Sequence, residues 1–122
     1  MKKKQGLYTS FSIAFKGIGL AFNERNFLID VVCAIIAIIL AFVFQISYLE
    51  WIAILFCIAL VLSLEMLNTV IEKTIDHLHP QQHQKAGEIK DIAAGSVLVA
   101  AIFSAIIGGL IFLPKIMAIL NS

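Results

Sequence analysis

Five polar side chains recur at helical spacing along an otherwise apolar segment: Glu65, Asn68, Thr69, Glu72 and Asp76. At 100° per residue they project from one stripe of a helix roughly 100° wide, whereas chance placement would scatter them around the helix. Carboxylate groups gathered in this way can bind a divalent cation or accept a proton from a substrate hydroxyl. We therefore take this stripe as the candidate centre for chemistry.

Glu65 is the most informative member because it lies inside the apolar run that begins at Trp51. An ionisable side chain within a membrane span costs about 2.5 to 3.5 kcal/mol on insertion scales, which makes it a functional candidate. The alternative is that Glu65 pairs with Lys73 or Lys90 and only stabilises the helix bundle. Lys73 is two helical turns away, too far for direct pairing, so we favour the functional interpretation.

Other charged residues flank the apolar runs. Lys90 and Asp91 precede a run that starts with small residues, which let a ligand or another helix approach closely. A lysine can bind phosphate as a point charge, although a lone lysine here is also typical of an interface anchor. Glu24 is expected at the same depth as Glu72, and two carboxylates beside water can hold Mg²⁺.

The polar stretch around Pro80 predicts a surface loop. Its histidines, His77, His79 and His83, can suggest a metal cluster, but without a nearby cysteine we favour solvated side chains. The chain has no glycine-rich phosphate loop and no Ser-His-Asp pattern.

The composition excludes a water-soluble domain. The 122 residues are 61% apolar and 14% charged, with a mean hydropathy of +0.98. A net charge of +1 without a basic stripe argues against nucleic acid as a partner. We expect an all-α integral membrane protein in which residues 1–122 form one membrane-embedded domain, so any chemistry is built on the spans.

Three apolar runs predict membrane-spanning helices at 28–45, 51–79 and 89–113, the last ended by Pro114 and Lys115. Small residues recur at four-residue steps along the third span and predict close helix packing, within or between subunits. They form the rows Ala100, Ser104, Gly108 and Ala101, Ala105, Gly109.

An amphipathic surface helix is predicted at residues 5–26. Its apolar positions follow steps of three and four: Leu7, Phe11, Phe15, Ile18 and Phe22. The opposite side carries polar residues, which disfavours the alternative of a fourth span.

The distribution of positive charge predicts the orientation, because Lys and Arg resist translocation. Lys115 lies alone after the third span, and the other eight of the nine cations share the opposite side. We expect a cytoplasmic N-terminus, an external C-terminus and a multi-pass protein; the eight cations are Lys2, Lys3, Lys4, Lys16, Arg25, Lys73, Lys85 and Lys90.

At this point the sequence resembles a known family. EMLNTVIEKTID at 65–76, with KDIAAG at 90–95, is similar to the signature of the small prokaryotic diacylglycerol kinases. NERNF at 23–27 and IFLPK at 111–115 resemble the branch that phosphorylates undecaprenol. The similarity covers about residues 7 to 117.

The resemblance implies a homotrimer of three-span subunits in the bacterial cytoplasmic membrane, with active sites shared between neighbouring subunits at the cytoplasmic interface. It also implies an ATP- and Mg²⁺-dependent lipid kinase that converts undecaprenol to undecaprenyl phosphate, with diacylglycerol as a second acceptor.

The same resemblance implies roles for individual residues. Glu65 corresponds to the catalytic base that meets the lipid hydroxyl, and Asn68 to its polar neighbour. Glu24 and Glu72 correspond to the metal carboxylates, which also contact ATP. The remaining ATP-contacting positions are Gln81, Gln82, His83, Lys90 and Asp91. Asp30 lies where some relatives carry Glu, and we assign it no role.

Two other function classes compete with a kinase. A small proton-coupled transporter would use Glu65 as its intramembrane proton site. A transporter would not need Lys90 and Asp91 beside an acidic stripe that is confined to one leaflet. It would also need a path out through the other side of the membrane, where Glu50 is the single acidic residue expected. A non-catalytic scaffold would not require five polar groups on one stripe.

Overall fold

The computed structural model describes residues 6–122, which form four helices: α1 (Leu7–Ala21), α2 (Arg25–Val43), α3 (Tyr48–Leu78) and α4 (Gln84–Leu120). Lys2, Lys3 and Lys4, and residue 5 of the predicted surface helix, lie outside this range. The three longer helices are long and apolar enough to cross a membrane. The protein is therefore an all-helical, multi-pass membrane protein.

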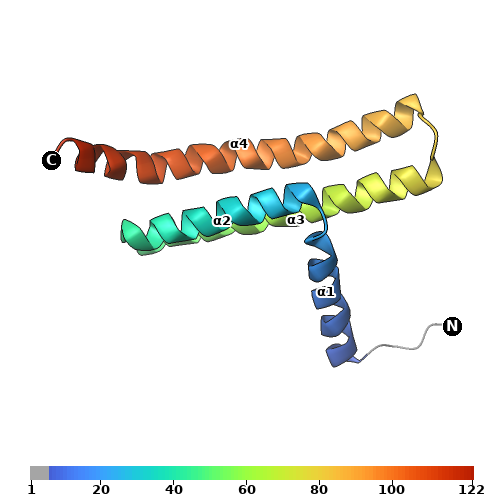
Figure 1. The fold of residues 1–122 in the computed structure, drawn as a ribbon, viewed down its shortest axis with the longest axis horizontal. Helices are drawn as coiled ribbons and strands as arrows, with labels where there is room; N and C mark the ends of the chain where they lie inside the picture. The colour runs from blue at the N-terminus through green and yellow to red at the C-terminus, as the bar shows by residue number, and fades with distance from the viewer. Residues whose placement is uncertain (1–5) are drawn as a thin grey trace.

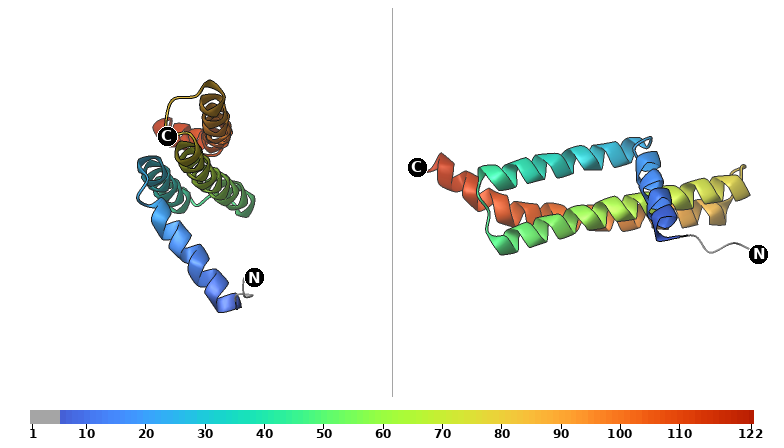
Figure 2. Two further views of the ribbon diagram at one scale, coloured as in Figure 1. Left: turned by 90° about the vertical axis from the view of Figure 1, so that its right-hand side faces the viewer. Right: turned by 90° about the horizontal axis from the view of Figure 1, so that it is seen from below.

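The helix α3 is central to the arrangement. It packs along α4 over most of its length and also contacts α2. Figures 1 and 2 show these three helices running alongside one another, while the short helix α1 runs across their direction beside the start of α2. The start of α2 lies beside the second half of α3, and the end of α3 meets the start of α4 beyond it.

The helices differ in length. The 19 residues of α2 extend about 28 Å, which nearly matches the ~30 Å of bilayer hydrocarbon. The 31 residues of α3 extend about 46 Å and the 37 of α4 about 55 Å, so both project beyond the hydrocarbon. A site at their ends is exposed to water while remaining attached to the spans.

The connection between α2 and α3 is defined by two capping motifs. Gln45 adopts a positive φ of 49°, and the Ile46 amide donates to the Ala41 carbonyl at 3.2 Å, as in a Schellman motif. The start of α3 carries a capping box, in which Ser47 and Glu50 each accept from the other's backbone amide. These contacts orient α3 antiparallel to α2.

The helix boundaries differ from the predicted ones at several points. The predicted 5–26 helix ends at Ala21, and α2 begins at Arg25 rather than at 28 after a short turn. The helix α3 begins at Tyr48 and ends at Leu78, close to the predicted 51–79. The helix α4 begins at Gln84 rather than 89, because the His83 imidazole accepts from the Ala86 amide and caps the added turn.

Beyond the predicted span of 89–113, the helix α4 continues through Pro114 to Leu120. Proline removes one backbone donor, which weakens a helix without necessarily ending it. The next residue, Lys115, donates from Nζ to the Ile111 carbonyl at 3.3 Å and to both carboxylate oxygens of Glu50 at 3.2 and 2.9 Å. These side-chain contacts hold α4 against α3 where the proline loosens it.

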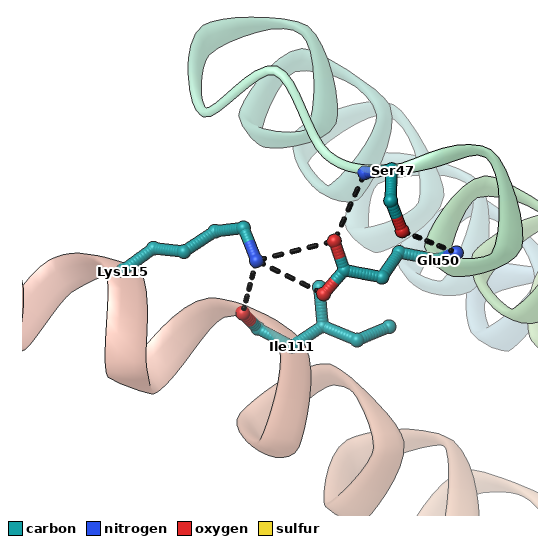
Figure 3. A network of polar contacts seen from close by, with 4 residues as sticks. All are labelled: Ser47, Glu50, Ile111 and Lys115. Atoms are coloured by element: carbon teal, nitrogen blue, oxygen red, sulfur yellow. Dashed lines mark hydrogen bonds and ion pairs between the residues drawn. The ribbon is translucent and has the colours of Figure 1, made fainter.

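Glu50 and Lys115 therefore connect the start of α3 to the last part of α4 (Figure 3). Glu50 also accepts from the Ser47 amide, so one carboxylate caps α3 and binds α4. An apolar cluster that includes Ala41, Ile54 and Phe112 lies at the same end of the bundle. This end is stabilised by packing and by one ion pair.

Replacing Lys115 with Met should lower the midpoint of thermal unfolding in detergent by a few degrees, because Glu50 then lacks its counter-ion. Glu50→Gln, which keeps an oxygen for the cap, should have a similar effect. Since the two groups act as a pair, the double variant should be no less stable than either single variant. Circular dichroism measures all three midpoints, and fully additive losses would contradict the pairing.

Candidate active site

The polar stripe on α3 runs from buried to exposed. Glu65 and Asn68 are 5% and 6% exposed and are the buried polar residues among those described. Glu72, one turn further, is half-buried, and Asp76 is exposed. One face of a single helix thus carries carboxylates from inside the bundle out to its end.

Hydrogen bonds order the middle of this stripe. The Asn68 side chain donates from Nδ2 to Glu72 Oε1 at 3.0 Å, while its Oδ1 is buried without a partner. The Thr69 hydroxyl donates to the backbone carbonyl of Glu65 at 3.1 Å, so its hydrogen atom is already bonded within the helix. Asn68 therefore fixes Glu72 and leaves one amide oxygen available to a ligand.

Asp30 joins Glu65 in the structure, although the sequence reasoning gave it no role. Its carboxyl group comes from α2 and lies within interaction range of the Glu65 carboxyl group. Asp30 Oδ2 is buried without a hydrogen-bond partner. The signal that could have found it is the one used for Glu65, a lone acid inside an apolar run.

Glu24 is carried to α3 by the turn between α1 and α2. Its Oε1 lies 2.9 Å from Lys73 Nζ, and Lys73 follows Glu72 directly in the chain. Because α2 starts at the next residue, this ion pair holds the start of α2 beside the Glu72 turn of α3. The two predicted metal carboxylates therefore belong to the same region.

Lys90 lies across from the outer end of the stripe. Its Nζ donates to Asp76 Oδ1 at 2.7 Å, so the start of α4 is joined to the end of α3. Both residues line a hollow of about 380 Å³ between these helix ends. The same lining includes four further predicted ATP contacts, Gln81, Gln82, His83 and Asp91.

The structure therefore divides the predicted site residues into two groups. Glu24, Glu65 and Glu72 do not line the hollow. Glu65 and Glu72 lie further down α3, and Glu24 lies in the turn before α2. Asp76 connects the carboxylates further down α3 with the hollow, because it lies one turn beyond Glu72 and pairs with Lys90.

The loop histidines do not form a metal cluster in the described range. His79 and His83 stack with ring centroids 5.0 Å apart. Across residues 6–122 no group of three or more His, Cys, Asp or Glu side chains is arranged to hold a metal ion.

Two residues of the stripe, together with Glu24, nevertheless fit Mg²⁺. Glu24, Glu72 and the unpartnered Asn68 Oδ1 supply oxygen donors alone. Mg²⁺ prefers oxygen ligands, keeps several waters and is usually completed by substrate phosphates, so it does not need a full protein cage.

An apolar groove of about 370 Å³ extends from this region into the membrane part of the bundle. Asp30 lies at the end nearest the stripe, and Ile54 and Phe112 line the opposite end. Apart from Phe112, the wall on α4 is made of small residues, among them Ala101, Ala105 and Gly108. A hydrocarbon chain can lie in such a groove without burying polar groups.

Several known proteins are similar to this chain in sequence. Residues 12–112 match the family described as prokaryotic diacylglycerol kinase. An undecaprenol kinase from Bacillus subtilis is 44% identical over 110 residues, which cover 89% of each chain. A diacylglycerol kinase from Haemophilus influenzae is 32% identical over 87% of this chain and 92% of its own.

A diacylglycerol kinase from Escherichia coli strain K12 is 28% identical over 76% of this chain and 77% of its own. The family match covers most of the chain and includes the whole polar stripe and the Lys90 region. The chain therefore belongs to the prokaryotic diacylglycerol kinase family.

Proposed function

We propose that the protein transfers the γ-phosphoryl group of ATP to the hydroxyl of a membrane lipid alcohol, with undecaprenol preferred and diacylglycerol as a second acceptor. The undecaprenol kinase relative and the family match support this activity. The observation that carries it is the stripe on α3, which joins buried Glu65 to exposed Asp76.

The depth of each carboxylate in the membrane suits the substrate group that it would contact. Because α2 is about as long as the hydrocarbon is thick, Glu24 and its partner Lys73 mark the membrane boundary. Glu65 lies about 10 Å of helix rise below Glu72, where the hydroxyl of a lipid alcohol can reach it. ATP arrives from water at the exposed end of α3.

In the proposed reaction, the lipid hydroxyl oxygen attacks the γ-phosphorus while the bond to the β-phosphate oxygen breaks and ADP leaves. Glu65 accepts the hydroxyl proton, and Asp30 lies beside it. Glu24, Glu72 and Asn68 would hold Mg²⁺, which when bound neutralises charge on the transferred group. Lys90 adds a fixed positive charge near the phosphates.

The hollow between α3 and α4 is our proposed nucleotide site. Gln81, Gln82 and His83 lie on its loop side, and Lys90 and Asp91 lie on its helix side. Phosphoryl transfer depends mainly on positioning and charge neutralisation, so these groups can act without a glycine-rich loop.

We further propose that three subunits assemble, with active sites between neighbours and α1 on the membrane surface. The exposed apolar residues of α1, including Phe11 and Phe15, support this placement. The cation asymmetry supports a cytoplasmic N-terminus. Nothing in residues 6–122 or in these relatives favours the transporter alternative.

Glu65→Gln should reduce turnover by roughly 10² to 10⁴-fold, the usual contribution of a general base, and leave ATP binding largely unchanged. Lipid phosphorylation and equilibrium ATP binding, measured on the same detergent-purified protein, test this. Full activity in the variant would remove Glu65 from the mechanism.

Glu24→Ala and Glu72→Ala should each raise the Mg²⁺ concentration for half-maximal activity several-fold, since each removes one metal carboxylate. Lys73→Met is the matched control, because it breaks the Glu24 ion pair while keeping the carboxylate. Mg²⁺ titrations of activity compare the three. An unchanged Mg²⁺ requirement in both alanine variants would contradict the metal assignment.

With undecaprenol and diacylglycerol offered together in micelles, most of the label from γ-labelled ATP should appear in undecaprenyl phosphate. Thin-layer separation of the two products measures the ratio. A product that is mainly phosphatidic acid would reverse the proposed preference, and no labelled lipid at all would overturn the kinase activity.

A further inference from the structure

We propose that Asp76 is a positioning residue for the nucleotide, because it holds the Lys90 ammonium group at the hollow where the ATP phosphates bind. This inference rests on the proposed function and assigns a role to a member of the stripe that the reaction above leaves unused. The observation is the 2.7 Å contact between Lys90 Nζ and Asp76 Oδ1, which joins α3 to α4.

The contact restricts a side chain that is otherwise free to move. The Lys90 and Asp76 side chains are 36% and 61% exposed, so little packing restrains either of them. A lysine has a flexible four-carbon stem, and ordering it costs conformational entropy each time a ligand binds. A neighbouring carboxylate that already holds the ammonium group reduces this cost for the incoming phosphate.

The pair leaves Lys90 able to bind a phosphate. An ammonium group has three donors, and Asp76 accepts from one of them. Both residues line the same hollow, so the remaining donors lie beside the space proposed for the nucleotide. Asp91, although adjacent to Lys90, forms no ion pair with it within the described residues. Asp76 is therefore the carboxylate that sets the position of Lys90.

Asp76 also has an opposing effect, because its negative charge repels the polyphosphate. Removing it would weaken ATP binding if orientation of Lys90 dominates, and would strengthen binding if repulsion dominates. Our proposal is that orientation of Lys90 dominates, so the sign of the change in ATP affinity on removing Asp76 tests it. Glu88→Gln is the matched control, since Glu88 is an exposed acid near the start of α4 and its loss changes net charge equally.

The experiment compares Asp76→Asn, Asp76→Glu and Glu88→Gln with the wild-type protein in one detergent. Calorimetry gives Kd for ATP, and lipid phosphorylation gives KM for ATP, kcat and the Mg²⁺ requirement. Asp76→Asn should raise Kd and KM about two- to fivefold, the size usual for exposed ion pairs, with kcat and Mg²⁺ requirement unchanged. Asp76→Glu should restore both, and Glu88→Gln should leave them unaltered.

An unchanged or lower Kd in Asp76→Asn would overturn the positioning role, as would an equal rise in Glu88→Gln. A lower kcat with unchanged KM would point instead to a structural effect and would also contradict it. Calorimetry does not depend on turnover. A wild-type protein that binds ATP without phosphorylating lipid would therefore overturn the proposed kinase function alone.

Discussion

The feature on which the rest depends is that α3 is longer than the hydrocarbon is thick. A helix that ended at the membrane boundary could present an acid inside the bilayer or in water, but not a continuous row from one to the other. At about 46 Å, α3 carries Glu65 among apolar side chains and Asp76 beyond them. A lipid alcohol and a nucleotide can therefore meet along a single helix face.

Ion pairs determine which segments lie beside the polar face of α3. Asp76 with Lys90 and Glu50 with Lys115 join α3 to α4 near opposite ends, and their spacing is almost the same along both helices. The exposed Asp76–Lys90 pair stabilises little and the partly buried Glu50–Lys115 pair more, and together they favour one antiparallel register. Glu24 with Lys73 adds the turn before α2. Charges from α3, from α4 and from the turn before α2 thus lie toward one end of the bundle.

The proposed site does not require a glycine-rich loop to bind the phosphates of ATP. Such loops supply backbone amides, whereas here side-chain carboxylates and a lysine project from rigid helices. Asn68 orders Glu72, and Lys73 orders Glu24, so the oxygen donors are held in place by neighbours on α3. The proposed site is accordingly a property of helix register more than of loop conformation.

The sequence by itself determined the three spans and the stripe, because apolar run length and 3.6-residue periodicity are local properties. It also marked Glu65, whose charge interrupts an apolar run. Only the tertiary structure decided that Asp30 faces Glu65, that Asp76 holds Lys90 and that α4 continues through Pro114. The first two depend on a side chain from another helix, and periodicity along one chain carries no information about which helix lies opposite.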